Sequence, residues 1–168
     1  MVSNLSQISL LTRREIEARI AGPLIRAFTE EFGEERVIPL AEKAILALAK
    51  EGGSRLASLL GGNSLEDFAR GYIFRDARSG GGSKFYSAGD DIEFQLLERS
   101  PKKLSLNVTY CRFAQMYREL GISELGYIFS CGRDFAMLEG FNSNIRFTRT
   151  KTLMEGGDCC DFRLSLEP

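Results

Sequence analysis

The chain has 168 residues, a formal net charge of −1 and no histidine. Its apolar fraction of 43% and charged fraction of 27% are ordinary for a globular protein, and its length suits one domain over residues 1–168. The charge balance argues against a nucleic-acid partner, which needs clustered lysine and arginine, and no apolar run approaches the roughly 20 residues that a membrane-spanning helix needs.

The first half of the chain, about residues 1–78, is predicted to form a helical layer. From Thr12, a candidate N-cap, large apolar residues recur every four positions and line one face of a predicted helix: Ile16, Ile20, Leu24, Phe28 and Phe32. Pro23 lies inside this pattern and predicts a kink. Gly33 predicts the end of this first helix.

A second helix is expected to follow. Its start is left open, because Pro39 fits best in a first turn, and its end is expected near Lys50. Its buried side is predicted to consist of Leu40, Ala41, Ala44, Ile45 and Leu48. Ser64 and Asp67 have the spacing of a capping box and predict another helix start.

The second half, about residues 84–168, is predicted to form a sheet and to carry the functional site. The glycine-rich stretch "SGGGSKFYSAGDD" predicts a loop at its beginning. Four runs with the composition and alternation of strands follow, and the first two read as a hairpin: "DIEFQLLE", "KLSLNVTYC", "NIRFTRT" and "CDFRLSLE".

Two helical stretches lie between these pairs of strands, "RFAQMYREL" and "SELGYIFSCGRDFAMLEG", and are expected to end at Gly121 and Gly140. We therefore expect an α+β fold, with N-terminal helices packed on a mainly antiparallel sheet of about four strands.

The missing histidine excludes Ser-His-Asp and Cys-His pairs and any histidine-ligated metal. The chain also lacks a Walker loop and a dinucleotide fingerprint after a strand. Four cysteines remain as candidates: Cys111, Cys131, Cys159 and Cys160. The N-terminal stretch has neither the basic start nor the apolar run of a signal peptide, so we expect a cytoplasmic protein with reduced thiols.

Cys111 lies where a strand is predicted to meet a helix. Amide groups at the helix start and the neighbouring Arg112 would lower the pKa of its thiol and make it reactive. The alternative is a small buried residue, which is the commoner role of a free cysteine. The residues alone leave both interpretations open.

Cys131 and Cys160 share helical or strand spacing with apolar residues, which indicates core positions. Charged neighbours, Arg133 and Asp134 near the first and Asp161 beside the second, place ionisable groups at the edge of each apolar stripe. A metal site built from three thiolates is conceivable, although the C-x2-C spacing of a typical zinc site is absent.

Several arginines in this half are candidates for binding a substrate carboxylate, because the planar guanidinium donates two parallel hydrogen bonds to such a group: Arg112, Arg133, Arg146 and Arg149. Each of them also fits a surface residue that is solvated or ion-paired.

The order of motifs between Val108 and Leu164 resembles that of the L-2-amino-thiazoline-4-carboxylic acid hydrolase family. The most specific pieces are "CRFAQMYRELG", "SCGRDFA", "GFN", "RTKTLMEG" and "CDFR", and the opening "LTRREIEARIAGPLIRAFTEEFGEE" is similar to the first helix of the family. The resemblance implies a hydrolase acting on a cyclic isothiourea, in which water opens the thiazoline ring and leaves an N-carbamoyl amino acid.

Carried over by motif, the resemblance implies these catalytic residues: Cys111, Cys160, Asp134, Asp161 and Cys131. It implies these substrate-binding residues: Arg112, Arg133, Asn142 and Arg149. We expect a small-molecule substrate, no cofactor, and no nucleic-acid or membrane partner, and homo-oligomer formation is left open.

A thiolate could attack the amidine-like ring carbon while a carboxyl group protonates the leaving atom. Cys111 ranks first as nucleophile, because its pKa is expected to be the lowest, and Cys160 ranks second. Two alternatives stay open. A metal ion held by Cys111, Cys131 and Cys160 could activate water, or the chain could be a non-catalytic small-molecule- or metal-binding domain on the same scaffold.

Overall fold

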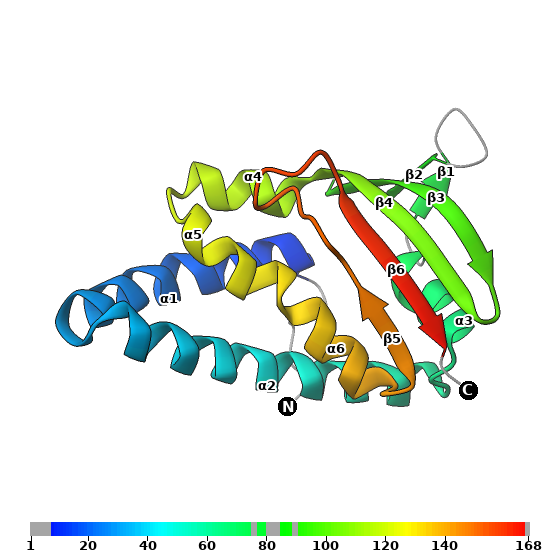
Figure 1. Ribbon diagram of the computed structural model, residues 1–168, viewed down its shortest axis with the longest axis horizontal. Coiled ribbons are helices and arrows are strands. Elements are labelled where there is room, and N and C mark those ends of the chain that lie inside the picture. The colour runs from blue at the N-terminus through cyan, green and yellow to red at the C-terminus, as the bar shows by residue number, and fades with distance from the viewer. Residues whose placement is uncertain (1–7, 75–76, 80–84, 89–90, 167–168) are drawn as a thin grey trace.

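The computed structural model describes residues 8–74, 77–79, 85–88 and 91–166. Two long N-terminal helices form an antiparallel hairpin whose turn lies at the end of the molecule away from the sheet, and shorter helices pack between this hairpin and the sheet (Figure 1). The predicted α+β fold with N-terminal helices and an antiparallel sheet is confirmed.

The sheet of the described residues has six strands in the order β1-β2-β3-β4-β6-β5, and all neighbours are antiparallel. The four predicted strands are present, together with two short strands at one edge. The bounds are β1 (Ala77–Ser79), β2 (Phe85–Ala88), β3 (Ile92–Ser100), β4 (Lys103–Cys111), β5 (Ile145–Thr148) and β6 (Cys160–Leu166). The loop predicted over residues 79–91 therefore contains β2, and residues 80–84 and 89–90 lie outside the described residues.

The alternation predicted for β4 positions the core on one face of the sheet. Leu104, Leu106 and Val108 are buried and pack with Leu164 of β6. Residues of two helices complete this core: Leu65 and Phe68 of α3 (Leu65–Phe68), and Leu138 and Phe141 of α6 (Arg133–Phe141). Every second side chain over this part of β4 is therefore buried on the same face of the sheet, as the alternation predicts.

Helix α1 (Leu10–Phe32) begins three residues earlier than predicted. Ser9 is the N-cap, because its hydroxyl accepts a hydrogen bond from the Thr12 amide at 3.1 Å. The helix continues through Pro23 and ends at Gly33, as predicted. Gly33 has a φ of 88°, a conformation that favours glycine.

Helix α2 (Glu34–Leu60) does not end near Lys50, so that prediction is wrong. Instead it continues through Gly53, which with Gly140 of α6 lets the two helices approach closely. A Cβ atom at Gly53 would collide with the Met137 carbonyl oxygen, and one at Gly140 with the Lys50 carbonyl oxygen. These glycines are required for backbone contact between the two helices, and the gain from packing outweighs their poor helix propensity.

The apolar face predicted for α1 is present, but it points outward. Its five large side chains are between 49% and 63% exposed, and Ala18, Gly22 and Ile25 form the buried face instead. On α2, Leu40 and Leu48 are exposed, whereas Ala49 and Gly53 are buried. The burial predicted for α2 is therefore wrong for Leu40, Ala44 and Leu48, whereas Ala41 and Ile45 are partly buried and pack against the core.

The remaining helices are short. The predicted capping box of Ser64 and Asp67 opens α3, which continues as the π-helical turn η2 (Ala69–Ile73). Helix α4 (Arg112–Glu119) follows β4 directly. The helix predicted up to Gly140 is divided into α5 (Ser123–Gly126), the π-helical turn η3 (Tyr127–Cys131) and α6. Within the described ranges, no helix combines the length and apolarity needed to cross a bilayer.

Candidate functional site

Three of the four cysteines meet at one end of the sheet. Cys111 is the last residue of β4 and the N-cap of α4, and Cys160 is the first residue of the adjacent strand β6, where it pairs with Val108. Cys131 comes from the end of η3. Electrostatic interaction links the three thiols, because a charge on Cys111 or Cys160 raises the pKa of Cys131. We call Cys111, Cys131 and Cys160 the cysteine cluster.

Burial raises the pKa of every thiol in the cysteine cluster. For Cys111, burial outweighs the opposing effect of the Ala114 and Phe113 amides at the start of α4. The expectation of a lowered pKa is therefore wrong, although Cys111 is only half-buried while the other two are buried. Because these thiols are protonated near neutral pH, any reaction at them needs a nearby proton acceptor.

Cys160 and Cys131 differ in their immediate contacts. The Cys160 Sγ accepts a hydrogen bond from the Leu153 amide at 3.2 Å, and burial still raises its pKa to about 11. Burial also raises the pKa of Cys131, and the nearby Asp134 carboxylate adds to that effect. Among the three, Cys160 has the amide that best stabilises a thiolate, and Cys111 has the best access to solvent.

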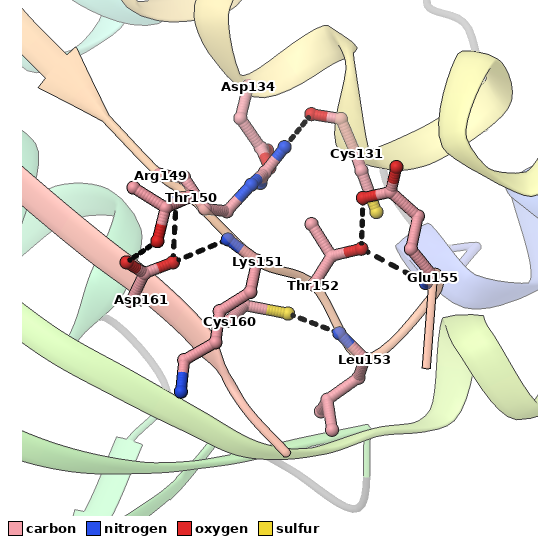
Figure 2. Close-up of polar contacts among 10 residues, drawn as sticks. All are labelled: Cys131, Asp134, Arg149, Thr150, Lys151, Thr152, Leu153, Glu155, Cys160 and Asp161. Carbon is pink, nitrogen blue, oxygen red and sulfur yellow. Dashed lines mark hydrogen bonds and ion pairs between the residues drawn. The ribbon is translucent and has the colours of Figure 1, made fainter. Parts of the chain in front are cut away.

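Arg149 is the central charged residue of the site, and its side chain is only 2% exposed. Its Nη1 donates to Asp134 Oδ2 at 2.7 Å and its Nη2 donates to the Cys131 carbonyl oxygen at 2.8 Å (Figure 2). Four aromatic rings surround its guanidinium, with centroids 5.2–5.9 Å from its carbon: Tyr127, Phe135, Phe147 and Phe162. The arginine thus ties the start of α6 to the segment after β5.

Asp134 pairs with this arginine and interacts electrostatically with the thiols. Burial raises the pKa of its carboxyl group, while the ion pair with Arg149 opposes that shift. About a quarter of its side chain remains exposed. Its charge raises the pKa of both Cys111 and Cys131, so it is electrostatically coupled to the cysteine cluster. This coupling makes the Asp134 carboxylate the candidate proton acceptor for a thiol of the cysteine cluster.

Asp161 differs from Asp134 in its environment and in its role. Its Oδ1 accepts hydrogen bonds from the Thr150 and Lys151 amides, both at 2.9 Å, and its Oδ2 accepts one from the Thr150 hydroxyl at 2.7 Å. Burial alone would raise its pKa, but these donors outweigh burial and lower the pKa to about 2. Asp161 is therefore a fixed anion that holds the segment after β5.

The "RTKTLMEG" stretch, residues 149–156, is held by contacts from several of its own residues. Thr152 and Glu155 exchange hydrogen bonds, at 2.8 Å between side chains and 3.1 Å from the Glu155 amide (Figure 2). Met154 packs so tightly on Gly126 that a Cβ atom there would collide with its sulfur. This segment presents the Leu153 amide to Cys160 and is a rigid side of the site.

A second charged group adjoins the cysteine cluster, and sequence reasoning identified only one of its members, Arg133. Arg133 lies 3.6 Å from Glu17 of α1, which also pairs with Arg14 at 2.7 Å. Both arginine side chains are largely buried, and the two guanidinium groups repel each other, which together with burial lowers the pKa of Arg133. Tyr117 interacts electrostatically with all three charges and with Cys131.

The hydroxyl group of Tyr117 is buried without a hydrogen-bond partner among the described residues. Two arginines, one glutamate and this unpaired hydroxyl form a group with excess positive charge and an unused donor, which suits an anionic ligand. We call Arg14, Glu17, Tyr117 and Arg133 the arginine group. No local spacing marks it in the sequence, since its members come from three helices.

Two candidate substrate-binding residues are not brought to the cysteine cluster. Arg112 pairs with Glu119 at 2.9 Å on the surface of α4. Asn142, at the end of α6, donates to the Asn63 carbonyl oxygen at 2.8 Å and accepts from the Asn144 amide at 2.9 Å. The structure assigns both side chains contacts within the fold.

The geometry of the described residues gives no support to the metal alternative. They contain no group of three or more histidine, cysteine, aspartate or glutamate side chains that could hold a metal ion. The fourth cysteine, Cys159, is buried next to Cys160, and no catalytic role follows from its position.

Among the solved structures, the chain is similar in fold to a trafficking protein particle complex subunit 3 from Naegleria fowleri covalently bound to palmitic acid. It has 15% sequence identity and a TM-score of 0.49, over 94% of this chain and 96% of that chain. No curated protein matches the chain. The model of the L-2-amino-thiazoline-4-carboxylic acid hydrolase family matches residues 13–164, a range that includes most of α1, the arginine group and the cysteine cluster, and the chain therefore belongs to this family.

Proposed function

We propose that this protein is a hydrolase that opens the ring of a cyclic isothiourea carrying a carboxylate, such as 2-amino-thiazoline-4-carboxylate, to an N-carbamoyl amino acid. One observation carries the proposal: in a member of this hydrolase family, three thiols lie at one end of the sheet, electrostatically coupled to the Asp134 carboxyl group, which pairs with Arg149, and the arginine group adjoins them. These are a nucleophile, a proton acceptor and an anion-binding group, which such a reaction needs.

Cys111 is the proposed nucleophile and Asp134 its proton acceptor. Cys111 is more accessible than Cys131 and Cys160, and Asp134 is electrostatically coupled to it. The Cys111 sulfur attacks the ring carbon between nitrogen and sulfur, and its proton passes to Asp134. The bond from this carbon to the ring sulfur breaks, and the proton moves from Asp134 to the released sulfur. The product of this step is an isothiourea joined to Cys111.

Water completes the reaction. It attacks the same carbon, gives a proton to Asp134, and displaces the Cys111 sulfur, which takes that proton back. Oxygen from water thus becomes the carbonyl oxygen of the N-carbamoyl group, and the enzyme returns to its initial state. Arg149 keeps Asp134 in place through the 2.7 Å ion pair and is a positioning residue in this scheme.

The arginine group is the proposed binding site of the substrate carboxylate. Arg14 and Arg133 share a single carboxylate, that of Glu17, and the Tyr117 hydroxyl has a hydrogen bond to give. A substrate carboxylate would share the two guanidinium groups with Glu17 or replace it there. Arg112, which the resemblance implies as a substrate-binding residue, has no role in this proposal, because its guanidinium pairs with Glu119 on the surface of α4.

The nucleophile is tested with purified protein and 2-amino-thiazoline-4-carboxylate. Cys111→Ser should lower kcat by at least about 10³-fold, while Cys159→Ser, a buried thiol outside the cluster, should retain activity. Mass spectrometry of the acid-quenched wild type should find Cys111 heavier by one intact substrate molecule. Full activity of the Cys111 variant would overturn this role, and an adduct on Cys160 would transfer it to that residue.

The carboxylate site is tested separately by comparing arginines. Arg133→Met should raise KM strongly with a smaller change in kcat, because it removes ground-state binding. Arg112→Met is the matched control on the surface and should leave both constants unchanged. Equal effects of the two changes would contradict the assignment to the arginine group.

A non-catalytic binding domain is the second candidate, and the raised pKa values of the thiols favour it. In that case calorimetry would show that the thiazoline binds, but neither the wild type nor any variant would release a free thiol from it. Release of thiol by the wild type at a rate above the uncatalysed one would rule the binding domain out.

A further inference from the structure

The outward apolar face of the α1–α2 hairpin is the largest feature that the proposed reaction leaves unused. Seven large side chains on it are about half to two-thirds exposed: Ile16, Ile20, Leu24, Phe28, Phe32, Leu40 and Leu48. Since an aromatic side chain has roughly 150–250 Å² and leucine or isoleucine somewhat less, they expose on the order of 700 Å² in one chain. Typical monomers show apolar patches of only about 300–600 Å², whereas stable protein interfaces take roughly 800 Å² from each partner.

The face is grooved. A cavity of about 600 Å³ opens between the two helices, and Leu24 and Phe28 of α1 and Leu40 and Ala44 of α2 line it. Phe129 of η3 also contributes to its lining. Such a groove accepts the side chains of another helix, which is how helices interlock when they pack.

Charges at the two ends of α1 indicate which helix fits. Arg13 and Glu31 are 18 residues apart on the same angular face of α1, with Ile20 and Leu24 between them. Neither side chain forms an ion pair in the part of the chain that the structure describes, and the Arg13 Nε is buried without a hydrogen-bond partner there. An arginine at one end and a glutamate at the other suit an antiparallel copy of the same helix.

We propose that the α1–α2 face binds a second copy of this chain, with the two α1 helices packed antiparallel about a two-fold axis near residue 22. Two-fold symmetry requires that residue i meets j and that j meets i. About residue 22, Ile20 meets Leu24 of the other copy, Ile16 meets Phe28, and Arg13 meets Glu31. Each pair occurs twice, so the dimer closes both ends with opposite charges.

The dimer is tested by sedimentation velocity of the full chain over a range of concentrations. The wild type should sediment as a dimer, and Leu24→Glu should convert it to a monomer with an unchanged circular dichroism spectrum. The control is Leu59→Glu, on an exposed apolar residue of α2 outside the groove, which should not affect association. A wild type that stays monomeric at all concentrations, or a dimer that Leu59→Glu disrupts and Leu24→Glu does not, would overturn the proposal.

The register is tested by exchanging charges. Arg13→Glu and Glu31→Arg should each weaken the dimer at least tenfold, because each brings two like charges together twice. The double variant restores opposite charges across the axis and should recover the dissociation constant to within about threefold. If the double variant does not recover, the antiparallel arrangement is wrong. Recovery would also exclude a lipid, a membrane or an unrelated protein as the occupant of this face, because none of these carries the complementary exchange.

Discussion

The α1–α2 hairpin and the end of the sheet depart in opposite ways from the usual arrangement, in which apolar side chains are buried and charged ones are exposed. The hairpin places Ile20, Leu24 and Leu40 on the surface, whereas the sheet end buries Arg149 beside the cysteine cluster. Large exposed apolar faces and buried charges are both unfavourable unless something is gained from them. The comparison supports the two proposals made above, association at the hairpin and chemistry at the sheet.

The two regions also differ in how completely their groups find partners within the chain. At the sheet end, Asp161 accepts three hydrogen bonds and Arg149 has partners on α6 and η3. On the hairpin, Arg13 and Glu31 have no ion-pair partner in the described ranges. The hydrogen bonds of Asp161 and Arg149 hold the sheet end in a fixed geometry. In the proposed dimer, Arg13 and Glu31 gain their ion-pair partners from the second copy of the chain.

The largest expected effect comes from the buried charge. Arg149→Met leaves Asp134 buried without its partner and should lower the free energy of unfolding by about 3–5 kcal/mol. The matched control is Arg55→Met, which breaks an exposed pair with Glu51 at 2.9 Å and should cost at most about 0.5 kcal/mol. Urea unfolding measures both. Equal losses would show that burial gives Arg149 no special importance.

The next effect concerns the contact that joins the two regions. Gly53→Ala forces α2 away from α6, because its Cβ would collide with the Met137 carbonyl oxygen, and should destabilise the fold by about 1–3 kcal/mol. Gly52→Ala, one residue earlier, meets nothing and should stabilise the helix by about 0.5–1 kcal/mol. Opposite shifts in midpoint would confirm the close approach, and shifts of one sign would contradict it.

Acid should weaken the sheet end through Asp161. Its pKa of about 2 in the folded state is below the ordinary value near 4, so its contribution is complete above pH 4 and is lost as the pH falls towards 2. Because the carboxylate is partly exposed, this contribution is about 1–2 kcal/mol. Asp161→Asn should flatten the fall in unfolding free energy between pH 4 and pH 2. A profile as steep as that of the wild type would exclude Asp161 as its origin.

The smallest effect is expected on the hairpin surface. Ile20→Gln changes an exposed side chain and should alter the unfolding free energy by no more than about 0.5 kcal/mol, measured at a dilution where the chain is monomeric. At higher concentration the variant should unfold at a lower midpoint than the wild type, because only the wild type gains stability from forming the dimer. A large loss at dilution would mean that Ile20 packs within its own chain.

The fold was largely predictable from the sequence because its strands follow simple local patterns. The alternation in β4 and the composition of β3, β5 and β6 fixed four strands, and Ser64 and Gly33 marked helix boundaries correctly. Helix α2 was predicted too short because Gly53 acts through a contact with α6, which no local propensity describes. The face of α1 was found, but periodicity does not reveal what covers a face.

The site was predictable only in part. Motif order pointed to Cys111, Cys131, Asp134, Cys160 and Arg149, which the structure gathers, but also to Arg112 and Asn142, which have other partners. The raised pKa of Cys111 depends on burial, which the sequence does not quantify. Arg14, Glu17 and Tyr117 were missed because the fold, rather than any spacing, brings them to Arg133.

One aromatic ring belongs to both regions. Phe129 lines the groove of the hairpin and stacks on Tyr117, with ring centroids 6.1 Å apart and planes within 7° of parallel. A helix seated in the groove would therefore rest on the ring that supports the Tyr117 hydroxyl. The apparent affinity for an anionic ligand should then vary with protein concentration, so that assembly and ligand capture in this molecule become thermodynamically linked.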